Sequence, residues 1–175
     1  MGPDELYKRL AEDPVHPTTT QPMPSDFAKT YGALSEDADA IVSIHLPAKV
    51  SGTCNAALQG IEIAKPKCEV HVVDGLSVSV GLGIIATAAA RVAKAGGKLV
   101  EVLEETEKAI SQTQIRGLLD TLHYLLKGGR ITKAKVRANR WCHPTSDTLC
   151  CRLIEGAGLG VHGGPGTLLV AARSG

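Results

Sequence analysis

Hydroxyl side chains stand in two loops of the sequence where they could bind an anion. Thr19 is the second of three consecutive threonines in the proline-flanked run 13–24, and Ser51 opens a Ser-Gly-Thr turn before an expected helix. A hydroxyl group can donate one hydrogen bond to a carboxylate oxygen. Backbone N–H groups at a helix start, here those of Gly52 and Thr53, favour the same kind of ligand. The two loops therefore indicate a carboxylate-binding site.

Each of these patterns also has a structural interpretation, which the sequence leaves open. A Ser-Gly-Thr segment before a helix is typical of a helix cap, and threonines beside proline are typical of a rigid surface loop. Asp74, at the end of an expected strand, could bind a metal or hold a neighbouring loop, and we favour the loop. Ser77 and Ser79 are candidates to cap the next helix. Arg130, in KGGRITK, is a candidate for contact with a partner or a ligand head group, or belongs to a solvated basic turn.

Patterns for cofactors and metals are weak. The GxG of Gly81 and Gly83 lacks the third glycine and the acidic partner of a dinucleotide fingerprint. A late segment carries atoms of metal-ligand type, but its adjacent cysteines are poor zinc geometry compared with a C-x₂-C pair. These residues are Cys142, His143, Cys150 and Cys151. We therefore expect neither a cofactor nor a metal ion.

An enzyme of the α/β type is an alternative to a binding protein. A hydrolase or transferase could use a serine, Ser51 or Ser79, with a histidine, His45 or His162. The G-x-S-x-G segment that presents the serine in many such enzymes is absent from the sequence. We favour binding over catalysis.

Composition limits the class of protein. The 175 residues are 43% hydrophobic and 21% charged, with a net charge of +1, which fits a soluble globular domain or a fragment of one. A near-neutral charge argues against nucleic-acid binding, and no apolar run approaches the ~20 residues that span a bilayer. Five cysteines without regular spacing favour a reducing cytoplasm. Aromatic residues are 3% of the chain, so a pocket would be mostly aliphatic.

The elements that would position these loops alternate between strand and helix. The sequence predicts helices over 3–12, 25–34, 53–64, 81–95, 100–111 and 120–127, strands over 40–46 and 69–73, and an apolar strand near the C-terminus. The strand 40–46 is apolar enough to be buried on both faces. This alternation predicts an α/β fold, a parallel sheet with helices on both faces. Ligands bind beyond the carboxyl ends of such strands, where the loops 46–53 and 74–83 lie. A first strand before the opening helix is missing.

Five segments together resemble the DegV family of fatty-acid-binding proteins. They are PTTTQPMPSDF (17–27), IVSIHLPAKVSGTCNAA (41–57), VVDGLSVSVGLG (72–83), LDTLHYLLKGGRITKAK (119–135) and GVHGGPGT (160–167), in the family's order. The resemblance divides the chain into a DegV-like N-terminal α/β domain (1–135), an unmatched segment (136–153) and a DegV-like tail (154–175). The family's opening strand and most of its second domain are missing.

The resemblance also implies a site and a function. Thr19 and Ser51 match the family's carboxylate-binding hydroxyls, and His162 matches its nearby histidine, although HGGPG is also a common turn. The supporting residues would be Thr20, Gly52, Thr53 and Ser79. The implied protein is a cytoplasmic carrier rather than an enzyme, whose ligand is a long-chain fatty acid and whose partner is a fatty-acid kinase. A non-functional fragment of a DegV protein is a further alternative.

Overall fold

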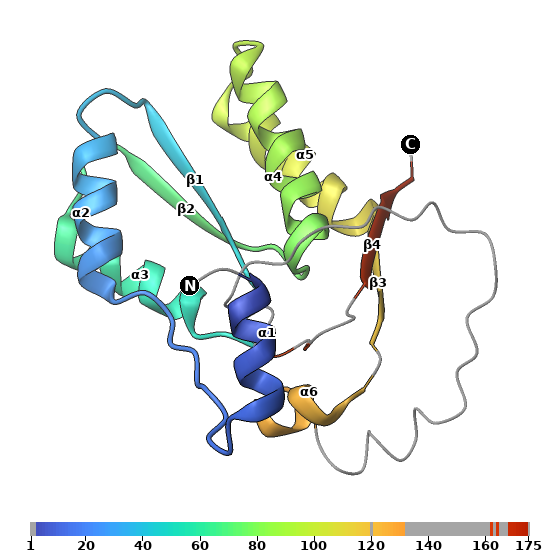
Figure 1. Cartoon of the computed structure of the whole chain (residues 1–175). Helices are drawn as coiled ribbons and strands as arrows, with labels where there is room; N and C mark the ends of the chain where they lie inside the picture. Colours follow the sequence, from blue (N-terminus) through green and yellow to red (C-terminus); the bar gives the residue numbers. More distant parts are fainter. Residues whose placement is uncertain (1–2, 120, 132–161, 163, 165–167, 175) are drawn as a thin grey trace. The chain divides into compact units, whose positions relative to one another are not determined.

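The described residues of the computed structural model, 3–119, 121–131, 162, 164 and 168–174, form helices and strands in the alternation that the sequence predicts (Figure 1). In chain order these are α1 (Pro3–Glu12), α2 (Pro24–Leu34), β1 (Ala40–His45), α3 (Thr53–Ala64), β2 (Glu69–Asp74), α4 (Ser79–Lys94), α5 (Leu99–Gln112), β3 (Thr113–Leu118), α6 (His123–Lys127) and β4 (Leu168–Arg173). They fall into two compact units. The first unit lies within Met1–Thr19 and Arg116–Val170, and the second within Thr20–Ile115 and Ala171–Gly175.

The centre of the second unit is a parallel pair of strands. β1 and β2 pair in register from Ala40 with Glu69 to His45 with Asp74, and α3 connects them. Helices α2 and α3 lie on one face of this pair, and α4 and α5 lie on the other (Figure 1). The predicted α/β class, a parallel sheet covered by helices, is therefore confirmed.

The burial of β1 differs from the prediction. Every residue of β1 is partly exposed, although the sequence predicts a strand buried on both faces. The reason is the topology, because β1 has β2 as its one hydrogen-bonded neighbour within the described residues. A strand with a single neighbour keeps one edge and part of each face open.

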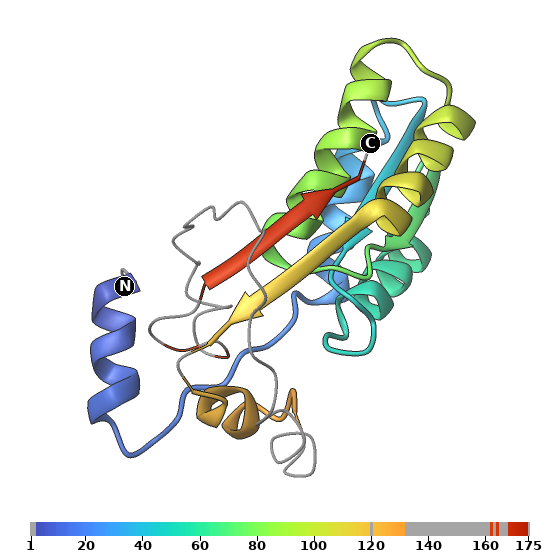
Figure 2. The ribbon, with the colours of Figure 1, turned by 90° about the vertical axis from the view of Figure 1, so that its right-hand side faces the viewer.

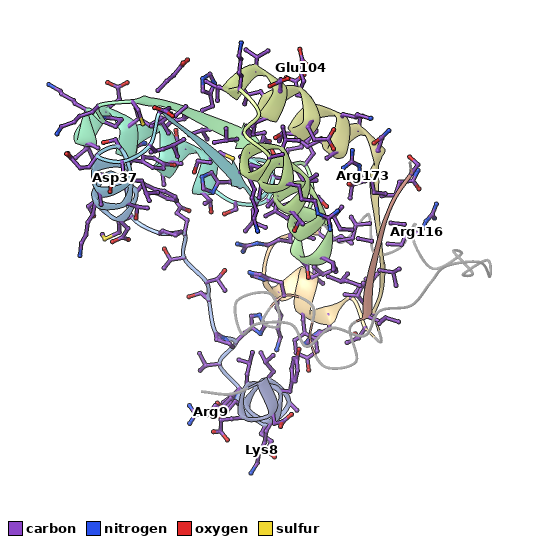
Figure 3. All side chains as sticks on the ribbon, turned by 90° about the horizontal axis from the view of Figure 1, so that it is seen from above. Lys8, Arg9, Asp37, Glu104, Arg116 and Arg173 are labelled. Carbon is purple, nitrogen blue, oxygen red and sulfur yellow. The ribbon has the colours of Figure 1, made fainter. Side chains whose placement is uncertain are left out.

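The remaining strands, β3 and β4, form a second two-stranded sheet and run side by side in Figure 2. The C-terminal strand predicted from the sequence is β4. In the second unit, Arg173 at its end donates from Nε to Oε1 of Gln112 at 3.0 Å and pairs from Nη2 with Oε1 of Glu105 at 2.6 Å. Arg173 is labelled in Figure 3. Both charged groups are about three-quarters buried, at 23% and 24% exposure. This ion pair therefore ties the chain end to α5.

The start of α2 differs from the predicted bounds. α2 begins at Pro24, one residue before the predicted start at Ser25, and its N-cap is Met23. The N–H of Met23 donates to Oδ2 of Asp26 at 2.9 Å. Proline at the first helical position has no N–H to satisfy. A proline and a carboxylate therefore stabilise the start of α2.

Separate apolar clusters stabilise the two units. In the first unit, Leu6 and Leu10 of α1 pack with Tyr7 and Tyr124. In the second unit, Ile85 and Ala109 are fully buried between α4 and α5 and pack with other aliphatic residues, Ala88, Ile44 and Ile110. None of the helices in the described part of the chain combines the length and apolar character needed to cross a bilayer.

Candidate functional site

The first unit joins two of the predicted site residues, which stand 143 positions apart in the sequence. Oγ1 of Thr19 lies 2.9 Å from Nε2 of His162, at hydrogen-bonding distance. The other ring nitrogen of His162, Nδ1, is buried without a hydrogen-bond partner among the described residues. It lies against Gly128, where any added Cβ would collide with it. The loop 13–24 and the C-terminal tail are thus held together by a polar contact.

The burial of Nδ1 determines how this hydrogen bond is oriented. A buried N–H without an acceptor costs more than an unused lone pair, so the neutral ring favours its proton on Nε2. In that tautomer Nε2 donates to Oγ1 of Thr19. The hydroxyl hydrogen of Thr19 is left free to donate to a ligand. His162 therefore acts as a positioning residue for the Thr19 hydroxyl.

Basic groups surround this contact. Burial lowers the pKa of His162 most, and electrostatic repulsion from Arg130, and from His16 when that ring is protonated, lowers it further. Burial, Lys127 and His123 lower the pKa of His16 in the same way. At neutral pH both rings are therefore uncharged in an electropositive environment, which favours an anion such as a carboxylate.

Two basic residues beside the Thr19–His162 contact, His16 and Lys127, are not predicted from the sequence. His16 stands three residues before Thr19 in the same loop, and its ring centroid lies 6.2 Å from that of Tyr124. Lys127 was also not singled out. The position of His16 in the proline-flanked run was the one available signal. Arg130 is exposed and donates from Nη1 to the carbonyl of Gly128 at 2.5 Å, which fixes its guanidinium on the glycine turn.

The second unit holds Ser51 at the start of α3. Oγ of Ser51 lies 2.6 Å from Oγ1 of Thr53. The same Oγ of Ser51 accepts a hydrogen bond from the N–H of Thr53 at 3.3 Å. Thr53 is buried, whereas Ser51 is half-buried. When Thr53 donates its hydroxyl hydrogen to Ser51, the hydrogen of Ser51 is free for a ligand. The N-cap of α3 is Gly52, against which the side-chain amide of Gln21 packs.

The other predicted residues of the second unit have structural contacts. Thr20 is exposed and its hydroxyl donates to the carbonyl of Gln21 at 3.3 Å. Ser79 is the first residue of α4 and lies in the left-handed region with φ of 49°. The N-cap of α4 is Val78, without a side-chain cap, so the prediction that Ser77 or Ser79 caps this helix is wrong. The chain reaches α4 through a left-handed residue, a conformation that the serine pattern did not indicate.

Asp74 holds the two loops that follow β1 and β2. Its Oδ2 accepts from the N–H of Ala48 at 3.1 Å, and its Oδ1 accepts from the N–H of Leu76 at 3.0 Å. Both carboxylate oxygens are therefore used by backbone groups. This is the loop-holding role that we favoured over metal binding.

His45 takes part in a partly buried chain of hydrogen bonds. Its Nε2 lies 2.7 Å from Oγ of Ser43, and the same oxygen lies 2.7 Å from the hydroxyl of Tyr31. The ring of Phe27 meets His45 edge-on with centroids 5.2 Å apart. His45 therefore bonds to Ser43 and not to the serine that the alternative enzyme would require.

No cluster of three or more histidine, cysteine, aspartate or glutamate side chains that could hold a metal occurs among the residues described. Cys142, His143, Cys150 and Cys151 lie outside the described residues. Cys54 is buried, and its thiol donates to the carbonyl of Leu46 at 3.4 Å. Burial raises the pKa of this thiol and Asp74 adds to the effect, so its sulfur stays protonated at neutral pH.

The histidine pKa values predict how stability depends on pH. Burial lowers the pKa of His45, as it does for His16 and His162. The unfolded chain then binds more protons than the folded one, so stability is complete above the ordinary value of about 6.5 and decreases as pH falls toward the folded pKa. We expect the melting temperature to fall between pH 7.5 and pH 5.5, and to fall less in His45→Gln. The amide of glutamine can still bond to Ser43 but does not titrate.

The unaltered protein, measured over the same pH range, is the reference for this comparison. An equal pH dependence in His45→Gln would show that His45 does not contribute.

Comparisons with known proteins agree with this architecture. A family model described as "Uncharacterised protein, DegV family" matches residues 1–137. A DegV domain-containing protein of Streptomyces coelicolor is 42% identical over 119 residues, which are 67% of this chain and 42% of the relative. One of Deinococcus radiodurans is 34% identical over 127 residues, which are 73% of this chain and 44% of the relative.

Solved structures show the same relation. A DegV family protein of Thermus thermophilus, described by its fatty acid binding, superposes with a TM-score of 0.71 at 35% identity, covering 77% of this chain and 48% of its own. A DegV family protein from Ruminococcus gnavus, described with vaccenic acid, gives a TM-score of 0.69 at 30% identity. This match covers 76% of this chain and 48% of the Ruminococcus gnavus protein. The chain thus spans less than half the length of these relatives. Because the DegV family model matches residues 1–137, which are most of this chain, the chain belongs to the DegV family.

Proposed function

We propose that this chain binds a long-chain fatty acid through hydrogen bonds from Thr19 and Ser51 to its carboxylate. The contact between Thr19 and His162 carries the proposal, because it directs a hydroxyl hydrogen toward a ligand in an electropositive environment. The Ser51–Thr53 pair offers a second donor of the same kind. Relatives described as fatty-acid-binding proteins support the choice of ligand. In the same proposal Gly52 and Thr53 support Ser51, Thr20 lies in the loop beside Thr19, and Ser79 is the first residue of α4.

Affinity for such a ligand comes mainly from its hydrocarbon tail. Burying ~14 methylene groups at ~0.8 kcal/mol each yields roughly 11 kcal/mol, and association costs of ~4–15 kcal/mol offset much of it. Hydrogen bonds to an ionised acceptor add ~1.5–3 kcal/mol each. The hydroxyl groups therefore fix the carboxylate and set its orientation, while the tail holds the ligand.

The proposed role is that of a cytoplasmic carrier, with catalysis left to a partner. Hydroxyl donors hold a carboxylate without enclosing it in the bidentate fork of an arginine. A carboxylate held in this way stays open to a second protein. The partner we propose is a fatty-acid kinase, which would phosphorylate the carboxylate, and the carrier itself needs no nucleophile.

Extraction of the purified protein tests the proposal. We expect organic solvent to release long-chain fatty acids that mass spectrometry detects in an amount comparable to that of the protein. A DegV-unrelated protein purified in parallel from the same cells is the control for carried-over lipid. A cooperative melt followed by circular dichroism must accompany the measurement, since a fragment that does not fold shows none. A folded protein without bound fatty acid, and without uptake of added fatty acid, would contradict the proposal.

A further inference from the structure

Three segments of the first unit meet at Tyr124 of α6. The ring centroid of His16, from the loop that follows α1, lies 6.2 Å from that of Tyr124. Gly164 of the tail lies so close to the Tyr124 ring that an added Cβ would collide with it. Leu6 and Leu10 of α1 pack with the same tyrosine. Tyr124 is therefore the point at which α1, the loop and the tail are joined to α6.

Two histidine ring nitrogens at this junction are buried without a hydrogen-bond partner among the described residues. They are Nε2 of His16 and Nδ1 of His162. A neutral imidazole can leave one lone pair unused, whereas a protonated imidazole is a donor at both nitrogens, and a buried donor without an acceptor is costly. Nδ1 of His162 lies against Gly128, whose carbonyl already accepts from Arg130. Both rings therefore fit their positions only when they are neutral.

The charges that act on the two rings are positive. Lys127 and His123 of α6 act on His16, and Arg130 acts on His162, as does His16 once it is protonated. The carboxylates of the described part of the first unit are exposed, and none of them forms an ion pair with either ring. These carboxylates are Asp4, Glu5 and Glu12 on α1 and Asp13 directly after it. Protonation of either ring therefore places a positive charge beside others of the same sign.

The first unit has little apolar packing to oppose a local opening. Its buried apolar residues within the described chain are Leu6, Leu10 and Val170, whereas most of the buried apolar residues lie on helices α2 to α5 of the second unit. Parts of a protein with few buried apolar contacts open at a lower free energy than the whole molecule. Charging two rings in the first unit can therefore open it while the second unit stays folded.

We propose that His16 and His162 form an acid-sensitive latch, which joins the loop after α1 and the tail to α6 at neutral pH and releases both in mild acid. In the open state each ring binds a proton with the ordinary pKa of about 6.5, whereas burial and the nearby cations lower the pKa in the closed state. The closed state is therefore fully stable above pH 6.5 and loses stability as pH falls toward the lowered pKa. Opening separates Thr19 from His162. The latch belongs to the chain without ligand and does not depend on the proposed fatty-acid function.

The tyrosines of the chain can report on both units in one experiment. The sequence contains three, of which Tyr7 and Tyr124 pack with the leucines of α1 in the first unit and Tyr31 is buried in the second. The probe is 3-fluorotyrosine in the delipidated full chain, followed by fluorine NMR from pH 7.5 to pH 5.5. Two rings that each take up a proton should raise the open-to-closed ratio by about tenfold or more over this range. We expect the signals of Tyr7 and Tyr124 to move together, and reversibly, to the position of an unfolded tyrosine.

The signal of Tyr31 is the internal reference, and it should stay distinct from that of an unfolded tyrosine. Unchanged signals of Tyr7 and Tyr124 down to pH 5.5 would overturn the proposal. So would unfolding of Tyr31 at the same pH, because the whole chain would then be the opening unit.

Glutamine variants identify the groups that titrate. The double variant His16→Gln, His162→Gln keeps polar side chains, one of which can still bond to Thr19, but has no ring to protonate there and should stay closed at pH 5.5. His71→Gln, on β2 in the second unit, is the matched control and should open as the unaltered chain does. Opening of the double variant at the same pH as the unaltered chain would overturn the proposal.

A charge variant keeps the test decisive if the double variant is already open at pH 7.5. Lys127→Gln removes a positive charge that acts on His16 and leaves both rings in place. With less repulsion in the closed state, this variant should open at a lower pH than the unaltered chain. An unchanged or higher opening pH in Lys127→Gln would overturn the proposal.

Discussion

The double variant Thr19→Ala, Ser51→Ala should bind a long-chain fatty acid at least about tenfold more weakly than the unaltered chain. Each hydroxyl donates to an ionised acceptor, a bond that contributes ~1.5–3 kcal/mol, and ~1.4 kcal/mol corresponds to a factor of ten in affinity. Both side chains are half-buried, so alanine removes a donor with little loss of packing. Titration with a fluorescent fatty acid measures the dissociation constants.

The contacts in the structure provide matched controls. Thr18→Ala removes an exposed hydroxyl beside Thr19, and Ser25→Ala removes an exposed hydroxyl on α2. Neither should change the affinity. His162→Ala should weaken binding nearly as much as Thr19→Ala, because His162 orients the Thr19 hydroxyl. Full affinity in the double variant would show that neither hydroxyl belongs to the site. If Thr18→Ala lost as much affinity as the double variant, the loss would not be specific to Thr19 and Ser51.

The elements of this fold could be predicted where local signals are strong. α1 over 3–12 and α3 over 53–64 have the predicted bounds, because proline or glycine and a clear apolar period mark their ends. The burial of β1 could not be predicted in the same way. Its aliphatic residues indicate a strand buried on both faces, and whether other elements cover those faces is a property of the whole sheet and not of the strand.

The candidate site shows the same division. Hydroxyl groups and glycines in loops drew attention to Thr19 and Ser51, and the family resemblance added His162. No pattern in the sequence predicted that Nδ1 of His162 lies buried against Gly128, or that Ser43 links His45 to the hydroxyl of Tyr31. The contact of His162 with Gly128 joins residues far apart in the chain, and Tyr31 reaches Ser43 from another element, so local patterns carry no information about either contact.

A single methyl group at Gly60 should destabilise the second unit, although alanine is the better helix former. Gly60 is buried where α3 crosses α2, and a Cβ there would lie 2.5 Å from Cβ of Phe27, 3.0 Å from the carbonyl oxygen of Pro24 and 3.1 Å from N of Ala28. Two of these atoms belong to the backbone of α2, so the helices must separate to admit it. Overpacking of this kind costs ~1–3 kcal/mol, against a gain in helix propensity of ~1 kcal/mol.

Gly32 on α2 is the matched control, because a Cβ there would meet nothing within 4 Å. Gly32→Ala should therefore raise the free energy of unfolding by ~0.5–1 kcal/mol through propensity alone. Gly60→Ala should lower the same quantity, and the melting temperatures should move in opposite directions, by ~2–4 °C per kcal/mol. Thermal or urea unfolding followed by circular dichroism measures both. If Gly60→Ala proves as stable as Gly32→Ala, then α2 and α3 do not approach each other as closely at this position as the structure shows. The packing of α2 against the face of β1 that carries Ser43 and His45 would then be wrong as well.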